Sequence, residues 1–317
     1  MSDACGARRD ARRRVERMRD GEERLGLLAA ALCALNGAFI PAVAKLTTGR
    51  ASPLLVAAAS NLFAALAALA LLAARRELRW LVERPRAWRL LAIAALGTGA
   101  AHLLLYLGAS RTTAIVTTLC LQIEPAYSLL LAWLVLGHRP TPRRLLATVV
   151  LLAGIALAVG ASAIETSLGV WFLLATPLCW QASHLVVLRG LVGVPALVLT
   201  SARYVYGGLL LTALWLVVEG PAALPARGTL SSLTPLLVLQ GLVLSYGGTL
   251  MWYVAIARID LARATAIVVP SIPLLSLAAS FVLLGEVATA TQWAGMGLTA
   301  AGILVFVTDR KGVTGDH

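Results

Sequence analysis

Long apolar runs alternate with short polar segments along almost the whole chain. A helix that crosses a bilayer needs roughly 20 predominantly apolar residues. Ten segments meet this requirement, and most of the connections between them are short. We therefore predict an all-α integral membrane protein with ten transmembrane helices, at 25–44, 53–73, 90–109, 112–136, 145–163, 168–188, 196–218, 234–256, 264–284 and 291–308.

The composition supports a bilayer as the solvent for most of the chain. Hydrophobic residues make up 59% of the sequence and charged residues 13%, with a mean hydropathy of +0.84. Soluble domains carry about a quarter charged residues. A soluble globular domain is excluded, and the lipid bilayer is an expected partner.

The net charge of +12 does not indicate a nucleic-acid partner, because the cations cluster between the apolar runs. Cytoplasmic loops of membrane proteins carry an excess of Lys and Arg. Most of the 27 Lys and Arg residues fall on one side when the N-terminus is placed in the cytoplasm. We predict a multi-pass protein of the plasma or inner membrane with both termini cytoplasmic, including a basic tail at 1–24 and a second tail at 309–317. We expect the first tail to be disordered or to form a short surface helix.

The two halves of the chain resemble each other. "PAYSLLLAWLVLG" from Pro125 aligns without a gap on "PLLSLAASFVLLG" from Pro273, and Asn61 aligns with Arg203. We predict two five-helix repeats, at 25–163 and 168–308. Because five is odd, the second repeat must be inverted relative to the first. Inverted repeats of this kind are a recurring transporter architecture, with the binding site near the bilayer midplane.

Each half resembles an EamA-type domain of the drug/metabolite transporter superfamily. The resemblance rests on Glu124–Pro125 followed by an apolar run and Gly137–His138, on the matching run from Pro273 to Gly285–Glu286, and on the aromatic-then-basic steps Tyr106 to Arg111 and Tyr253 to Arg258. It covers about residues 25–308. The resemblance implies a ten-helix secondary carrier that exports amino acids or other small metabolites.

The chain departs from that family pattern at two positions. Ile272 stands where the second half would carry an acid, and His138 stands where the first half would carry the glutamate of "GE". These differences leave the substrate and the coupling ion open.

Glu124 is the only acid inside a predicted span, and a charge at the bilayer centre is costly enough to indicate function. Thr113, Thr117, Cys120, Glu124 and Ser128 recur at steps of three or four, which places them on one helix face. Pro125 lacks an N–H group, so the helix should kink beside the carboxylate. We expect Glu124 to face a polar cavity, where a carboxylate could bind and release a proton.

Arg203 is the only base inside a predicted span, and Tyr204 follows it on the same polar stripe. A guanidinium suits a carboxylate or a phosphate. In one interpretation Glu124 and Arg203 neutralise each other, or bind backbone groups, as a structural clamp. In another, Glu124 binds a proton or an amine while Arg203 binds a substrate carboxylate. The sequence leaves both open, and a pair that breaks to admit substrate would satisfy both.

Asn36, Asn61, Trp180, Gln181 and His184 are further candidates for substrate contact. Asn36 and Gln181 lie at matching depths on the first and sixth spans, and Asn61 is the repeat counterpart of Arg203. For each of these, an interhelical hydrogen bond worth about 0.6 kcal/mol is the alternative to substrate contact.

No motif indicates a cofactor, a metal site or an enzyme. The 4 Cys residues show no metal-ligand spacing, and no Walker A pattern occurs. We predict a secondary active exporter of a small polar or zwitterionic, amino-acid-like metabolite that works by alternating access, with proton coupling as one option. The alternative is a lipid or lipid-linked-sugar translocator of similar architecture. The sequence is compatible with either a monomer or a homodimer.

Overall fold

The computed structural model describes residues 2–137, 139–160, 167–259 and 261–308. These residues form helices and contain no strand, so the predicted all-α fold is confirmed. The first half consists of α1 (Ser2–Thr48), α2 (Pro53–Ala74), α3 (Arg79–Val82), α4 (Arg84–Ala94), η1 (Ala95–Ala100), α5 (Ala101–Arg111), α6 (Ala114–Leu121), α7 (Glu124–Leu136) and α8 (Pro142–Val159).

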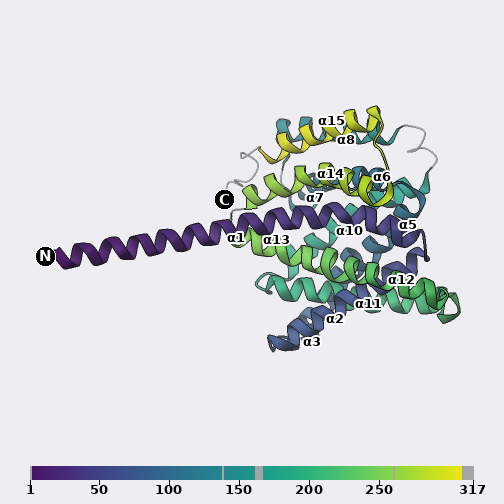
Figure 1. Ribbon diagram of the computed structural model, residues 1–317, viewed down its shortest axis with the longest axis horizontal. Coiled ribbons are helices and arrows are strands. Elements are labelled where there is room, and N and C mark those ends of the chain that lie inside the picture. The colour runs from purple at the N-terminus through teal and green to yellow at the C-terminus, as the bar shows by residue number, and fades with distance from the viewer. Residues whose placement is uncertain (1, 138, 161–166, 260, 309–317) are drawn as a thin grey trace.

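The second half repeats this order of long helices. It consists of α10 (Leu168–Gly190), α11 (Ala196–Val218), η2 (Pro221–Ala223), α12 (Arg227–Val238), η3 (Leu239–Gly247), α13 (Gly248–Ile256), α14 (Leu261–Leu284) and α15 (Ala290–Val307). Figure 1 shows the long helices lying roughly along one direction, with α8 and α15 side by side at one edge of the bundle.

Nine helical stretches within the described ranges are long and apolar enough to cross a membrane. The span expected at 264–284 corresponds to α14, in which the apolar helix Pro270–Leu284 is shorter. Many bulky apolar side chains on the outer helix faces are exposed, for example Leu134, Val149 and Val282. This exposure is what a lipid environment requires, because lipid rather than protein covers these side chains.

The segments 74–89 and 219–233, which lie between predicted spans, are partly helical. The segment at 74–89 contains α3 and the start of α4, and α12 begins at Arg227, inside the segment expected to be a loop. The N-terminal tail also differs from both expectations, because residues 2–20 extend α1 straight out of the bundle (Figure 1). Its Ala, Arg and Glu residues are strong helix formers, which favours this continuation.

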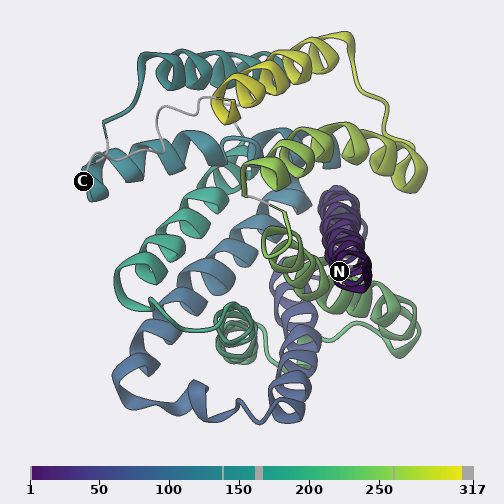
Figure 2. The ribbon, with the colours of Figure 1, turned by 90° about the vertical axis from the view of Figure 1, so that its left-hand side faces the viewer.

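The second half is inverted relative to the first. We call the end of the bundle where α1 enters at Gly21 the tail face, and the end where α1 finishes at Thr48 the far face; Figure 2 views the bundle from the tail face. Five interactions join the start of a first-half span to the end of a second-half span. They are Glu22–Arg258, Arg89–Gly190 and Arg143–Thr308 at the tail face, and Ser52–Glu219 and Ala114–Glu286 at the far face.

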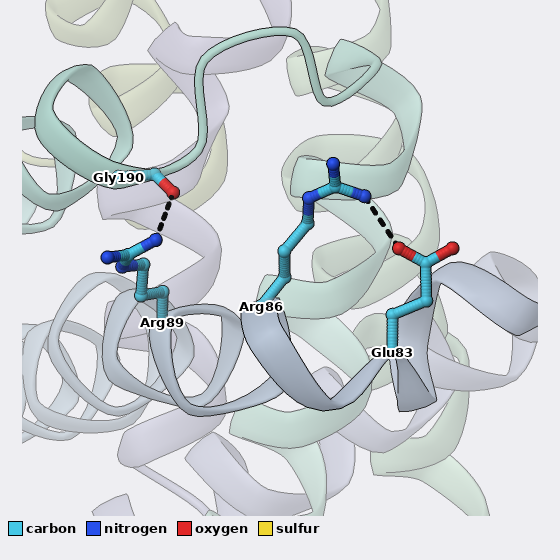
Figure 3. A network of polar contacts seen from close by, with 4 residues as sticks. All are labelled: Glu83, Arg86, Arg89 and Gly190. Carbon is cyan, nitrogen blue, oxygen red and sulfur yellow. Dashed lines mark hydrogen bonds and ion pairs between the residues drawn. The ribbon is translucent and has the colours of Figure 1, made fainter.

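Each half crosses the bundle five times, so every second-half helix runs opposite to its first-half counterpart. One of the tail-face interactions appears in Figure 3, where the guanidinium of Arg89 donates to the carbonyl of Gly190 at 3.0 Å. The neighbouring pair, Arg86 and Glu83, lies on the same short stretch of chain at 2.6 Å.

The helix contacts between the two halves show the same two-fold relation. The α5 segment packs against α10, and its counterpart α13 packs against α1. The symmetric pairs α2–α11 and α8–α15 also pack closely. The core therefore lies along the junction of the two halves, which is where the polar residues meet.

Candidate functional site

Three of the long passes are irregular near their centres: one is divided by a turn, and two contain π-helical segments. The pass expected at 112–136 is divided into α6 and α7 by a turn at Gln122 and Ile123. The N–H groups of these residues bond three residues back, to Leu119 and Cys120, at 3.2 and 3.3 Å. Pro125 then lies in the first turn of α7, where its missing N–H is not needed.

Glu124 is the first residue of α7. The N-terminal end of a helix attracts negative charge, so the break places the acid where α7 helps to hold a carboxylate. The expected kink is thus a short turn between α6 and α7, within a pass that remains one helical stretch from Ala114 to Leu136.

The passes containing η1 and η3 widen into π-helix at equivalent places in the two halves. Such segments are frequent at functional sites because they disturb the regular ladder of backbone hydrogen bonds. Each offers a carbonyl to a side chain from another helix: Gly97 accepts from Arg203 at 2.7 Å, and Val243 accepts from Asn36 at 3.0 Å.

One cavity of about 250 Å³ lies at the junction of the halves. From the first half, α1, α5 and α7 line it, with Cys33, Ile40, His102, Leu105, Tyr106 and Glu124. From the second half, α10, α11, η3, α13 and α14 line it, and their aromatic or polar contributions include Trp180, His184, Arg203, Tyr204, Gln240 and Trp252.

Glu124 and Arg203 line this cavity from opposite halves, but they are not ion-paired with each other. Glu124 Oε1 accepts a hydrogen bond from Gln181 Nε2 at 2.8 Å. Arg203 donates to Gly97 through Nη2, and its buried Nε has no partner among the described residues. The guanidinium lines the same cavity as Glu124, His102 and His184.

Gly97 allows this approach of Arg203 to the backbone. A Cβ at position 97 would lie 2.9 Å from both Nε and Nη2 of Arg203 and 2.6 Å from Ser183 Oγ. Only glycine leaves room for the guanidinium here, so the sequence "LGTGA" matters for the placement of the charge.

The eight residues selected from the sequence divide into two groups. Glu124, Trp180, His184, Arg203 and Tyr204 line the cavity. The other three lie behind its wall as partners: Gln181 bonds Glu124, Asn36 bonds the π segment η3, and Asn61 Oδ1 lies 2.8 Å from His102 Nδ1.

Asn61 also donates to the carbonyl of Ala57 at 2.7 Å and is almost fully buried. Its repeat counterpart Arg203 reaches the cavity, whereas Asn61 acts on it only through His102. His138, the departure from the family pattern in the first half, lies outside the described residues.

Several cavity residues were not selected from the sequence, notably Tyr106, Gln240, Ser245 and Thr249. Tyr106 belongs to the aromatic-then-basic step but was not selected for the site. The other three are single neutral polar groups in apolar runs and carry no pattern that separates them from packing residues. The Tyr204 ring packs against His102 at 6.1 Å and against Tyr246 at 5.7 Å, which connects α5, α11 and η3.

Comparisons with known proteins agree with this architecture. The model of the EamA-like transporter family matches residues 24–160 and again residues 167–308. One curated relative, a probable terminal-alkyne amino-acid exporter from Streptantibioticus cattleyicolor, is 32% identical over 229 residues, which cover 71% of this chain and 75% of the relative.

One solved structure, described only as the crystal structure of a protein, superposes with a TM-score of 0.60. It is 19% identical and covers 90% of this chain and 96% of its own, so it supports the fold alone. The two family matches, one to each inverted half, account for nearly all of the described helices. The chain belongs to the EamA-like transporter family.

Proposed function

We propose that this chain is a secondary active exporter of a small zwitterionic, amino-acid-like metabolite, working by alternating access between its two halves. One observation carries the proposal: an acid and a guanidinium from opposite halves line one cavity without pairing with each other. A zwitterion carries the two complementary charges. Bound between Glu124 and Arg203, it would neutralise both and hold the halves together during the transition.

The hydrogen-bonding capacity of each charged group leaves room for a ligand. An ionised carboxylate accepts up to about four hydrogen bonds and a guanidinium donates five, while Glu124 and Arg203 each use one with the partners described above. A substrate ammonium would bond the Glu124 carboxylate, and a substrate carboxylate would bond the free N–H groups of Arg203. Arg presents these groups as a planar fork that matches a carboxylate.

The size and lining of the cavity favour a small solute. Its volume of about 250 Å³ lies below the roughly 300–1,000 Å³ of pockets for drug-sized ligands. Ile40, Leu105, Leu244 and Ile272 give it apolar walls for an aliphatic side chain. The relative from Streptantibioticus cattleyicolor is named for an amino-acid substrate, which supports the same class here. No observation favours a lipid or lipid-linked sugar.

Proton coupling follows from competition for one carboxylate. Glu124 is compensated either by a proton or by the substrate ammonium, and both cannot occupy it together. If the empty carrier returns only with Glu124 protonated, inward proton movement drives outward substrate movement. We place the tail face in the cytoplasm, because most Lys and Arg residues between the spans lie there.

Counterflow in proteoliposomes tests the proposal. Vesicles loaded with an unlabelled solute are diluted into the same labelled solute, and uptake is followed for amino acids, nucleosides, organic anions and a fluorescent lipid. We expect aliphatic amino acids, including L-norvaline and the terminal-alkyne amino acid L-propargylglycine, to accumulate transiently. The control variant is Glu83→Gln, which removes a carboxylate bonded only to Arg86 at the tail face. Accumulation of the lipid but of no amino acid would refute the proposal.

A further inference from the structure

We propose that Gln240 is a specificity residue whose side-chain oxygen accepts a hydrogen bond from the side chain of the substrate. The inference rests on the proposed function, since it assigns a further part of the amino-acid site. It predicts that substrates with a terminal donor on the side chain are preferred over equally long substrates without one.

The hydrogen bonds of Ser60 and Tyr106 favour one orientation of the Gln240 amide. Ser60 Oγ donates to the carbonyl of Val56 at 2.7 Å, which uses the one hydrogen of its hydroxyl. Tyr106 must therefore donate to Ser60 in the 3.1 Å contact between their oxygens. The Tyr106 oxygen can then only accept. Gln240 lies beside Ser60 and Tyr106 in the cavity wall, and its NH₂ group is the end of the amide that suits this oxygen.

This orientation leaves the Gln240 oxygen as an acceptor. Gln240 is 1% exposed and lines the cavity, and its Oε1 has no hydrogen-bond partner among the described residues. A buried acceptor without a partner costs free energy, and a ligand donor that satisfies it recovers that cost. The amide is also separate from the charged pair, because its neighbours Ser60 and Tyr106 lie on α2 and α5.

The backbone beside Gln240 packs closely against α2. Gly241 packs directly against α2, where a Cβ would overlap the carbonyl of Ser60. This close contact places Gln240 in the cavity wall beside Ser60. A site that is built to bond a substrate donor discriminates strongly against an analogue without that donor.

Three amino acids with equal numbers of heavy atoms in their side chains provide the test. L-homoserine ends in a hydroxyl donor, L-propargylglycine ends in a weak C–H donor, and L-norvaline ends in a methyl group. Inhibition constants for each are measured by competition in counterflow, with the full-length protein and with Gln240→Met. The readout is the ratio between ligands within each protein, because comparing ratios cancels the different solvation of the free amino acids.

We expect the preference for homoserine over norvaline to fall about five- to tenfold in Gln240→Met. The preference for propargylglycine over norvaline should fall about twofold, since C–H hydrogen bonds are weaker. Tyr106→Phe retains Gln240 but no longer orients it, and it should lower the homoserine preference in the same direction. Thermal unfolding of each variant establishes that it is folded.

Equal ratios in the wild type and Gln240→Met would overturn the assignment while leaving the proposed function intact. An unchanged homoserine preference in Tyr106→Phe would refute the orientation argument. If no amino acid is transported by the wild-type protein, the proposed function is wrong, and the role of Gln240 as an acceptor for an amino-acid side chain is overturned with it.

Discussion

The fourth pass of the first half and its counterpart in the second half have the same place in the fold but different centres. The first is divided into α6 and α7, with Glu124 at the break; the second, α14, continues through Pro270 and Pro273 and carries Ile272 at the corresponding position. Both residues line the same cavity. The repeat thus duplicates the fold of this pass, but only the first half has a charged residue at this position.

The second passes show the complementary difference. Arg203 in α11 reaches the cavity, and Asn61 in α2 remains in the wall and bonds His102. Each half supplies one charge, and the two charges have opposite signs. A symmetric scaffold with an asymmetric site can bind a dipolar ligand in one orientation in every state of the cycle.

The largest expected effect concerns Glu124. In Glu124→Gln, export driven by a pH gradient should fall to background, because the amide cannot alternate between a proton and a substrate ammonium. Exchange of substrate for substrate should remain measurable. The assay is efflux from proteoliposomes after a pH jump. Glu83→Gln is the matched control, since it makes the same change at a tail-face carboxylate that pairs with Arg86; it should retain gradient-driven export.

Arg203 should have the next largest effect. Arg203→Lys keeps the charge but loses the planar fork, and we expect the half-saturating substrate concentration to rise about 10- to 100-fold, which corresponds to about 1.5–3 kcal/mol for a charge-assisted hydrogen bond. Concentration-dependent counterflow measures this value. The same change at Arg86, an exposed residue paired with Glu83, should alter it less than twofold. Equal effects of the two substitutions would contradict the role of Arg203.

Glycines of η3 and α15 are expected to differ in how much their substitution lowers the stability of the fold. Gly241→Ala forces a Cβ against the carbonyl of Ser60, whereas Gly297→Ala meets nothing within 4 Å. We expect Gly241→Ala to destabilise the fold by about 1–3 kcal/mol or more, as overpacking does, and Gly297→Ala to be neutral. Thermal unfolding in detergent distinguishes them. A tolerated Gly241→Ala would show that η3 does not lie against α2 as described.

The smallest expected effect concerns the far face, where the Glu286 carboxylate accepts from the N–H groups of Ala114 and Ile115, both at 3.1 Å. Glu286→Gln weakens this bond between the halves by about 1 kcal/mol. Cys33 is a free thiol that lines the cavity. If the weaker bond opens the far face more often, labelling of Cys33 by a membrane-impermeant maleimide from that face should increase about fivefold in Glu286→Gln.

The labelling is done with the other cysteines replaced. Glu219→Gln, which alters a bond to the single hydroxyl of Ser52 at the same face, is the control and should change labelling less. Decreased labelling in Glu286→Gln would contradict a role of Glu286 in closing the far face.

Much of the fold could be predicted because the bilayer imposes strong local constraints. Span length, the repeat from Pro125 to Pro273 and the odd number of spans per half were enough to predict inversion. The break before Pro125 was foreseeable as a kink, because a missing N–H is a local property. The widening of η1 and η3 was not, since it depends on helices that pack against Gly97 and Gly241.

The site was predictable for charges and less so for neutral groups. A formal charge within an apolar run is costly and therefore conspicuous, which is why Glu124 and Arg203 could be selected. Asn36 and Asn61 could not be assigned to the wall or the cavity, because the sequence does not fix how each helix is rotated. Tyr106 and Gln240 could not be selected because their role depends on lying beside Ser60, and the three residues come from three different helices.

Binding of one zwitterion between Glu124 and Arg203 is tested most directly by competition for labelled L-norvaline on the purified protein. Pentanoate lacks its ammonium group and butylamine lacks its carboxylate. The wild-type protein should bind norvaline at least about 100-fold more tightly than either, Glu124→Gln should selectively lose the advantage over pentanoate, and Arg203→Gln should selectively lose the advantage over butylamine. If all three compounds compete equally, or if both variants lose the same advantage, the two charges do not bind one substrate between them.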